Sequence, residues 1–308
     1  MEKLGFVYKR LDDDCLEDVQ YLFRIVFNKT QTISYIKNKY NTSYLGVKYI
    51  CHIAYFKDKP VAFYGAIPQK FSSTSSSILV AHACDSFTVK EFQNKGLHYN
   101  LALLSYELMK VEGIKFVYAY HSENTYFSTK KLGWLEHKKM QRFHFGINTF
   151  PLSKGIKKLH LEKKYQKICS VYLTKFQNSK NYSNSLYTNR FLQEYDRDFI
   201  QYKNSFNKHY FIELNDCNFW IKIDSVLHIG FFRTTSNENF KKALRKLKTI
   251  AFFLGITEIL FQVLIDSKEY QLLSKLQTPK ESWLVGYLPF QSINLEEFEF
   301  NYADLDTF

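Results

Sequence analysis

Apolar residues recur with two different periods along this chain, and the alternation predicts a mixture of strands and helices. Two β-rich runs, at 49–56 and 61–67, flank the polar sequence KDKP and predict a hairpin. The apolar run ILVAHACDSFTV at 78–89 predicts a central strand. A helix with apolar residues at Leu97, Leu101, Leu104 and Leu108 follows, and then the strand KFVYAY. Residues 1–150 thus predict the order β-α-α-β-β-β-α-β-α-β, a mixed α+β layout.

The second half of the chain repeats part of this pattern. The sequence NFKKALRKLKTIAFFLGITEILFQVL at 239–264 again predicts an amphipathic helix, a glycine and an apolar strand. The turn that leads into this helix, TTSNEN, contains no glycine. We therefore expect a domain at 1–150 and a degenerate copy of it at 151–308, joined by a Lys-rich helix at about 154–177. An unrelated α+β domain is the alternative for the second half.

Composition limits the class of protein. Of the 308 residues 45% are hydrophobic and 18% aromatic, which is enough for a sizeable core. No apolar run approaches the ~18 residues that a membrane span needs, and the charged start MEKLGFVYKR does not resemble a signal peptide. The five cysteines are scattered, which indicates free thiols and no metal site. We expect a cytoplasmic protein.

The formal net charge of +12 indicates a polyanionic partner. Nucleic acid, an anionic membrane and phosphorylated small molecules all meet that description. The positive charge is uneven, since KGIKKLHLEKKYQK at 154–167 is dense in Lys and no Lys or Arg follows Lys280. The simplest interpretation of the Lys-rich run is a solvated helix face.

The turn Gln93-Asn94-Lys95-Gly96 stands between a predicted strand and a predicted helix. A helix N-terminus has unsatisfied backbone N–H groups and a partial positive charge, so such a turn can bind a pyrophosphate. A purely structural turn explains this pattern equally well. After the next strand comes the polar cluster HSENTYF, at the edge where open α/β sheets bind ligands.

Three segments together, QNKGLHYNLALLSYEL, GIKFVYAYHSEN and STKKLGW, resemble the GNAT superfamily of acyl-CoA-dependent N-acyltransferases. The resemblance covers about residues 5–147. It implies a GNAT fold with a central mixed, splayed sheet, and acyl-CoA as co-substrate without a metal. The segments CDSFTVKEFQNKGLHYNLA, HSEN and FNYADLDTF also look like two-domain GNAT proteins of bacterial surface-polysaccharide clusters, some of which acylate nucleotide-linked amino sugars.

The resemblance implies that one turn holds the CoA pyrophosphate through its backbone amides: Gln93, Asn94, Lys95, Gly96, Leu97 and His98. Gln93 takes the place of the usual Gln or Arg, and Gly96 that of the first glycine. His98 departs from the usual Gly or Ala, so its side chain either narrows the approach or reaches the phosphate. Asn124 is the expected partner of the pantetheine arm.

Acyl transfer to an amine requires a neutral amine and stabilisation of charge at the thioester oxygen. In GNAT proteins a backbone N–H of the splayed central strand provides the stabilisation, which here falls around 84–88. The candidates for a general base are Asp85, His121 and Glu123. The leaving-group acid of the family would fall on Thr129, so we take Tyr126 as its substitute. Asp85 has a structural alternative as a cap or as a partner of the following loop, and Tyr126 has one as a packing residue.

The C-terminal sequence FNYADLDTF places Asp304 and Asp306 on one face if the segment is extended. One interpretation is a solvated chain end, which we favour slightly for Asp304. The resemblance instead implies that the segment folds back near the acceptor, which we favour for Asp306.

The sequence thus favours a cytoplasmic N-acyltransferase, monomeric or dimeric. It would transfer an acetyl or short hydroxyacyl group, such as 3-hydroxybutyryl, to a nucleotide-linked amino deoxysugar, with dTDP as the expected nucleotide, for O-antigen or capsule synthesis. The product would serve lipopolysaccharide biosynthesis. One alternative is a transferase of the same fold that takes an aminoacyl group from charged tRNA, as peptidoglycan-bridge transferases do. The other is a basic nucleic-acid-binding protein, although no RNA-binding motif is present.

Overall fold

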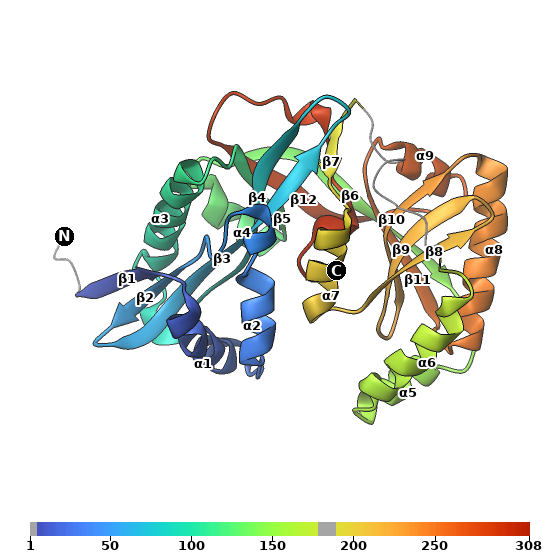
Figure 1. Ribbon diagram of the computed structural model, residues 1–308, viewed down its shortest axis with the longest axis horizontal. Coiled ribbons are helices and arrows are strands. Elements are labelled where there is room, and N and C mark those ends of the chain that lie inside the picture. The colour runs from blue at the N-terminus through green and yellow to red at the C-terminus, as the bar shows by residue number, and fades with distance from the viewer. Residues whose placement is uncertain (1–4, 178–188) are drawn as a thin grey trace. The chain divides into compact units, whose positions relative to one another are not determined.

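The computed structural model describes residues 5–177 and 189–308, except for the side chains of Glu123 and Asn124 (Figure 1). The chain forms two compact units. Unit 1 comprises Met1–His137, Ser183–Phe206 and Gly286–Glu299, and unit 2 comprises Lys138–Tyr182, Asn207–Val285 and Phe300–Phe308. Each unit is therefore built from three separate segments. The domain division at residue 150 stays a prediction, to which the Discussion returns.

Unit 1 contains a mixed sheet in the order β1-β2-β3-β4-β5. These strands are β1 (Phe6–Arg10), β2 (His52–Phe56), β3 (Lys59–Ser72), β4 (Ser77–Thr88) and β5 (Phe116–His121). Neighbours are antiparallel from β1 to β4, whereas β5 runs parallel to β4. The far end of β3 pairs with β7 (Phe191–Gln193), which in turn pairs with β13 (Phe298–Glu299).

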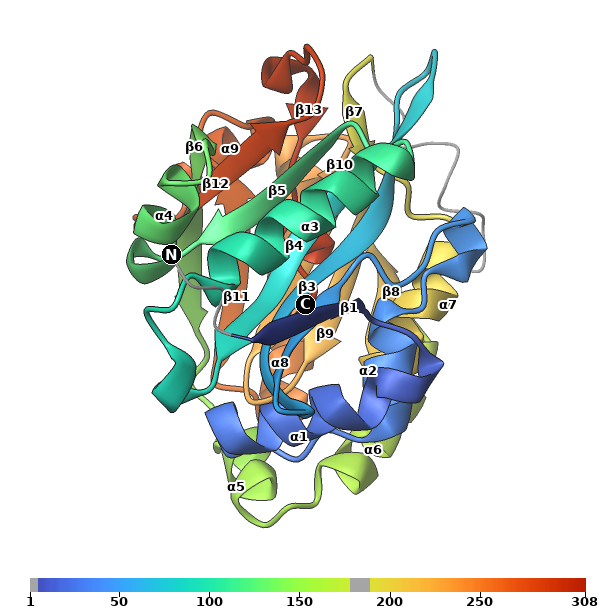
Figure 2. The ribbon, with the colours of Figure 1, turned by 90° about the vertical axis from the view of Figure 1, so that its left-hand side faces the viewer.

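Five helices of unit 1 are described: α1 (Leu16–Phe27), α2 (Ile33–Tyr40), α3 (Leu97–Val111), α4 (Glu123–Lys130) and α7 (Arg197–Phe206). Successive strand residues face opposite sides of a sheet, so β3 contributes side chains to the packing on both faces. Tyr64 joins the apolar core under α3, whereas the Phe63 ring contacts Tyr40 of α2 at a centroid distance of 5.4 Å. Figure 2 shows α3 lying across one face of this sheet.

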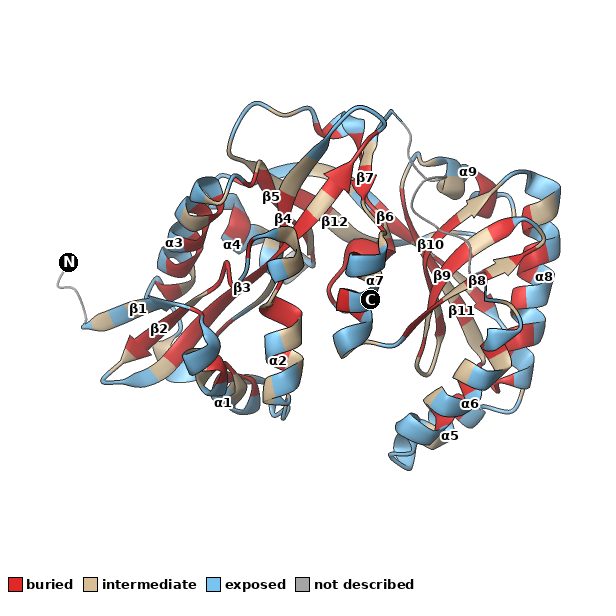
Figure 3. Cartoon of the chain, viewed as in Figure 1, coloured by how far each residue is buried: buried red, intermediate tan, exposed pale blue. Residues whose placement is uncertain are grey.

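Unit 2 contains parallel and antiparallel strands in the order β6-β11-β10-β9-β8. The strands are β6 (Leu135–Gly146), β8 (His209–Leu214), β9 (Cys217–Ile223), β10 (Leu227–Thr234) and β11 (Glu258–Leu264). The described helices are α5 (Leu152–Lys158), α6 (Glu162–Thr174), α8 (Asn237–Phe253) and α9 (Lys268–Ser274), and β12 (Lys280–Pro289) follows. The buried core of unit 2 comes from these strands and from α6, α8 and α9, and Figure 3 shows buried segments on the strands and on α8.

The two units share one connection pattern. In unit 1 the antiparallel pair β3–β4 leads through α3 to β5, parallel to β4. In unit 2 the antiparallel pair β9–β10 leads through α8 to β11, parallel to β10. A short helix and a strand follow in each case, namely α4 and β6 or α9 and β12. The predicted repeat in the second half is thus present in the order and direction of its elements.

The Lys-rich segment differs from the prediction. The sequence predicts a single helix at about 154–177, but the structure has α5 and α6 with a break between them. His160, within the break, adopts a left-handed backbone conformation with φ of 54°, which no α-helix accommodates. Tyr165, Cys169 and Leu173 of α6 belong to the core of unit 2. Among the described residues, no helix is long and apolar enough to cross a bilayer.

Candidate functional site

In unit 1 the central strands β4 and β5 separate soon after they meet. Their parallel register joins only Ala81 to Val117 and His82 to Tyr118. β4 then continues to Thr88 and β5 to His121 without further pairing between them. The predicted splay of the central sheet is therefore confirmed. It leaves backbone groups of both strand ends available to a ligand.

A β-bulge lies on β4 where the strands separate. Tyr64 of β3 pairs with Ser86 and Ala66 pairs with Ala83, so two residues of β4, Cys84 and Asp85, face a single residue of β3. The extra residue of a bulge is left out of the hydrogen-bonded ladder. The bulge thus turns backbone groups out of the sheet at the position where the sequence predicts the thioester oxygen.

Gly65, the residue opposite the bulge, has no room for a side chain. A Cβ atom there would lie 2.8 Å from Cε1 of Phe63, 2.9 Å from the hydroxyl of Tyr40 and 3.0 Å from the carbonyl oxygen of Asp85. The close approach of Tyr40 to the bulge consequently depends on glycine at this position.

Asp85 is held by two side chains of α2. Its Oδ2 accepts a hydrogen bond from the Tyr40 hydroxyl at 2.5 Å and forms an ion pair with the Lys39 ammonium. Lys39 is only 2% exposed, and its carbonyl oxygen accepts a hydrogen bond from Tyr202 of α7 at 2.6 Å. Burial, reinforced by the Asp85 charge, raises the pKa of Tyr40 well above its ordinary value, so this hydroxyl remains a donor.

Lys39 and Tyr40 were not among the residues that the sequence singled out. In the sequence they are part of a short polar helix, ISYIKNKY, 46 and 45 residues away from Asp85. No local pattern indicates that a lysine of such a helix is buried. A possible signal was Asp85 itself, since a carboxylate within an apolar strand needs a partner.

The predicted pyrophosphate turn forms the start of α3. Asn94 and Gly96 have φ values of 62° and 76°, a left-handed conformation that favours glycine. A Cβ atom on Gly96 would meet nothing within 4 Å, so this glycine is needed for the backbone conformation and not for space. Among the described residues, no side chain caps the α3 N-terminus, and its first amides remain available to an anion.

The corresponding turn of unit 2 is different. The hydroxyl of Ser236 caps α8 by accepting a hydrogen bond from the backbone N–H of Asn239 at 3.1 Å. One of the first amides of α8 is therefore already satisfied by the protein itself. Of these two helix starts, only that of α3 is left without a side-chain cap.

The side chains of the α3 turn point in several directions. Gln93 donates from Nε2 to the carbonyl oxygen of Thr88 at 3.3 Å, and the Lys95 ammonium lies 4.8 Å from the ring centroid of Phe92. The ring of His98 packs edge-on against Tyr64, with 5.8 Å between the centroids, and burial lowers its pKa. His98 consequently faces the sheet, although the sequence suggested that it narrows the approach to the turn or contacts the phosphate.

His121 lies at the end of β5 and is 5% exposed. Its Nε2 is buried without a hydrogen-bond partner among the described residues. Burial, with a smaller contribution from His82, lowers the pKa of His121 to about 4, so the imidazole is neutral near pH 7. A neutral imidazole can accept a proton. Glu123 and Asn124 follow in α4, but their side chains lie outside the part of the chain that the structure describes.

Tyr126, the predicted leaving-group acid, donates its hydroxyl hydrogen to the carboxylate of Glu136. Its ring also lies 5.6 Å from the Lys130 ammonium. Thr129, at the position where the family has its usual tyrosine, is buried and donates to the carbonyl oxygen of Tyr126 at 2.9 Å. The Tyr126 hydroxyl is therefore engaged by a carboxylate, and the role of acid stays a prediction.

The C-terminal segment is folded and buried in unit 2. Residues Tyr302–Asp304 form a 3-10 helix, so the segment is not extended and the predicted alternation of Asp304 and Asp306 does not apply. Asp304 is fully buried, and its Oδ2 accepts a hydrogen bond from the Asn301 backbone N–H at 2.6 Å. Asp306 is 7% exposed. The interpretation as a solvated chain end is thus corrected, because apolar packing of Phe308 and Tyr302 fixes this segment.

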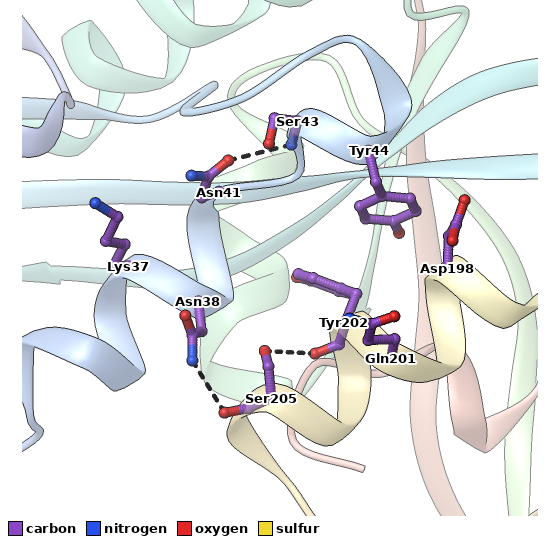
Figure 4. Close-up of a pocket in the computed structure, with 9 residues that line it drawn as sticks. All are labelled: Lys37, Asn38, Asn41, Ser43, Tyr44, Asp198, Gln201, Tyr202 and Ser205. Carbon is purple, nitrogen blue, oxygen red and sulfur yellow. Dashed lines mark hydrogen bonds between the residues drawn. The ribbon is translucent and has the colours of Figure 1, made fainter.

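A depression in unit 1 lies between α2 and α7 (Figure 4). Its lining is polar apart from two tyrosines: Lys37, Asn38, Asn41, Ser43, Tyr44, Asp198, Gln201, Tyr202 and Ser205. The rings of Tyr44 and Tyr202 lie 5.3 Å apart, and Asn38 donates to the carbonyl oxygen of Ser205 at 3.1 Å. Several lining groups are thus bonded to one another, and Lys39 and Tyr40, which hold Asp85, do not line this depression. We do not assign it to the reaction centre.

No protein-family model and no curated protein sequence matches this chain. Among solved structures it is similar to a proposed acetyltransferase from Pyrococcus horikoshii, with 16% identity, 98% of this chain and 97% of that chain covered, and a TM-score of 0.56. A GCN5-related N-acetyltransferase from Kribbella flavida matches with 11% identity, coverage of 92% and 70%, and a TM-score of 0.59. Saccharomyces cerevisiae N-myristoyltransferase with bound myristoyl-CoA matches with 12% identity, coverage of 94% and 83%, and a TM-score of 0.57. Across nearly its whole length, the chain has the fold of the GCN5-related N-acetyltransferases.

Proposed function

We propose that this protein is an N-acyltransferase that moves an acyl group from acyl-CoA to an amine. The observation that carries the proposal is one arrangement in unit 1. A bulged strand, β4, separates from its parallel neighbour and leads, through a short 3-10 helix at Lys90–Phe92 and the turn after it, to the uncapped N-terminus of α3. The solved structures with this fold include acetyltransferases and a myristoyl-CoA complex, which supports the same reaction class.

The residues of the α3 turn fit a CoA pyrophosphate. The space around Gly96 is open, no side chain occupies the helix start among the described residues, and the helix dipole favours negative charge there. In this proposal the amides of 93–98 bind the two phosphates, and Asn124 contacts the pantetheine arm. The amine attacks the thioester carbonyl of acyl-CoA, the C–N bond forms as the C–S bond breaks, and Tyr126 protonates the departing CoA thiolate in this proposal. The backbone at Cys84 and Asp85 donates to the oxygen of that carbonyl.

Two side chains near the point where β4 and β5 separate are candidates to accept the proton of the amine. His121 is neutral near pH 7 and can accept a proton, although its Nε2 is buried and lies against Gly286. Lys39 and Tyr40 both bind Oδ2 of Asp85. Because these partners stabilise the ionised carboxylate, Asp85 is better suited to orient the acceptor's amino group than to take a proton from it. In this proposal His121 or Glu123 is the base, and positioning of the two substrates can by itself supply about 7–11 kcal/mol.

We further propose that the acceptor is the amine of a nucleotide-linked amino deoxysugar, with dTDP as the expected nucleotide. The support is the resemblance of CDSFTVKEFQNKGLHYNLA and HSEN to proteins of surface-polysaccharide clusters, together with the net charge of +12, which suits two anionic substrates. The acyl group in this proposal is acetyl or a short hydroxyacyl. The reaction would take place in the cytoplasm and serve O-antigen or capsule synthesis.

Titration calorimetry with acetyl-CoA tests the CoA site. We expect Gly96→Asp to weaken binding at least tenfold, because it places a carboxylate beside the phosphates. Gly113→Asp is the matched control, since Gly113 also has a positive φ of 78° and open space but lies beyond the other end of α3. Equal losses in both variants would point to a folding defect and contradict the assignment of the turn.

Absence of acetyl-CoA binding by the wild type would remove acetyl-CoA as the donor, and binding of longer acyl-CoAs or charged tRNA would then decide the donor class. If acetyl-CoA binds, release of free CoA thiol in the presence of dTDP- and UDP-linked amino sugars tests the acceptor. We expect turnover with at least one of them and none with the corresponding 2-, 3- or 4-hydroxy sugar. Turnover only with peptide or protein amines would overturn the sugar acceptor and leave the CoA site intact.

A further inference from the structure

Two neighbouring segments of unit 2, 150–161 and 252–253, expose large apolar side chains, which we call the apolar tip: Phe150, Leu152, Leu159, Leu161, Phe252 and Phe253. Phe150 is 78% exposed, Leu159 68% and Phe253 65%. Exposed apolar residues that occur singly are normal on protein surfaces. Contiguous groups of them mark a site of interaction.

The two segments of the apolar tip are fixed to each other. The hydroxyl of Thr149 donates to the carbonyl oxygen of Phe252 at 3.0 Å. The backbone N–H of Ser153 donates to the carbonyl oxygen of Gly255 at 3.1 Å. Gly255 has a φ of 64°, and a Cβ atom there would lie 2.4 Å from Cβ of Leu152. Glycine thus lets the chain after α8 approach the start of α5, and the tip is a packed structure.

The segment that carries four residues of the apolar tip, Phe150, Leu152, Leu159 and Leu161, is also rich in positive charge. Five exposed lysines lie between residues 150 and 164, with one exposed acid among them, Glu162: Lys154, Lys157, Lys158, Lys163 and Lys164. Figure 3 shows α5 almost entirely exposed. The sequence analysis treated this run as a solvated helix face, but solvation alone does not explain why apolar side chains of the same segment are exposed as well.

We propose that the apolar tip docks on an anionic lipid membrane surface. A nucleic acid would match the lysines but leave the phenylalanine and leucine side chains in water. An apolar protein surface would match those side chains but not the lysines. The boundary of an anionic bilayer satisfies both, because apolar side chains enter the edge of the acyl region while lysines meet charged headgroups. This inference concerns unit 2 alone and does not depend on the proposed function.

Co-sedimentation with lipid vesicles tests the proposal on the full chain. We expect binding to vesicles of phosphatidylcholine and phosphatidylserine in a 7:3 ratio, at least tenfold weaker binding to pure phosphatidylcholine, and a decline with added salt. The variant Phe150→Ser/Leu159→Ser/Phe253→Ser removes three exposed side chains and should lower the affinity at least tenfold. Changing Lys154, Lys157 and Lys158 to Gln leaves Lys163 and Lys164 in place and should weaken both the binding and its salt dependence.

The control variant is Val7→Ser/Ile25→Ser/Val111→Ser, which removes three exposed apolar side chains of unit 1 and should bind vesicles like the wild type. All three triple variants should retain the thermal transition of the wild type. Failure of the wild type to bind the anionic vesicles would overturn the proposal, as would undiminished binding by the tip variant. Two other results would replace it: a concentration-dependent dimer that the tip variant abolishes, or tRNA binding that depends on the lysines but not on the apolar residues.

Discussion

Asp85 and Lys39 are individual residues whose pairing can be measured. Lys39 is 2% exposed, and the Asp85 side chain is 21% exposed. Removing one partner of a largely buried ion pair leaves the other charge without compensation. We therefore expect Lys39→Met to lower the free energy of unfolding by about 3 kcal/mol. The double variant Lys39→Met/Asp85→Leu should recover part of this loss, as determined by urea denaturation of the four proteins. Simply additive losses would show that the pair is not coupled.

Burial of His121 should make the folding stability of the protein depend on pH, and one substitution can test this contribution. Its pKa falls from 6.5 to about 4 through burial, so the unfolded chain binds a proton between these values and the folded chain does not. Stability must therefore decrease as the pH falls from about 6.5 to about 4, by up to about 3 kcal/mol from this group. His121→Gln cannot titrate in this range. We expect its denaturation midpoint to vary less with pH than that of the wild type, and parallel pH profiles would contradict the assignment.

At the scale of the element, the bulge of β4 depends on a glycine of the neighbouring strand. A methyl group on Gly65 would press against Phe63, the Tyr40 hydroxyl and the backbone of Asp85. We expect Gly65→Ala to lower the free energy of unfolding by about 1–3 kcal/mol through overpacking. It should also lower kcat in the assay that measures release of free CoA thiol, because the bulge shifts. Gly146→Ala is the control, since a Cβ atom there meets nothing within 4 Å. Equal effects of the two substitutions would show that the crowding at Gly65 is tolerated.

The elements around the site differ in how far they could be predicted. The turn at 93–96 and the helix after it are specified by neighbouring residues, a positive-φ glycine and a helical apolar period, so the sequence predicted them. The Lys39–Asp85 pair depends on packing between α2 and β4, and no residue close to either in sequence indicates it. The break at His160 was missed because the residues on both sides favour a helix and histidine is an uncommon residue at positive φ.

At the scale of the whole molecule, the periods of the sequence predicted the repeated connection pattern but not how the segments are distributed. The three segments of unit 1 alternate along the chain with the three segments of unit 2. Residues 183–206 return to unit 1 to form β7 and α7, where Phe199 is 1% exposed. A strand of three residues and a helix of ten carry no signal that identifies the sheet they join, because any apolar face of the right size would satisfy them.

Unit 1 should therefore require residues from the end of the chain. Phe298 is 1% exposed, stacks on Phe191 with 4.9 Å between ring centroids and packs edge-on against Phe116 of β5 at 5.0 Å. We expect Phe298→Ala to lower the free energy of unfolding by about 3–5 kcal/mol, whereas Phe127→Ala, at a side chain that is 70% exposed, should have almost no effect. A fragment of residues 1–150 lacks Phe298, β7 and α7, so its circular dichroism should show no cooperative thermal transition. A fragment that unfolds cooperatively would instead establish residues 1–150 as an independent domain, as the sequence predicts.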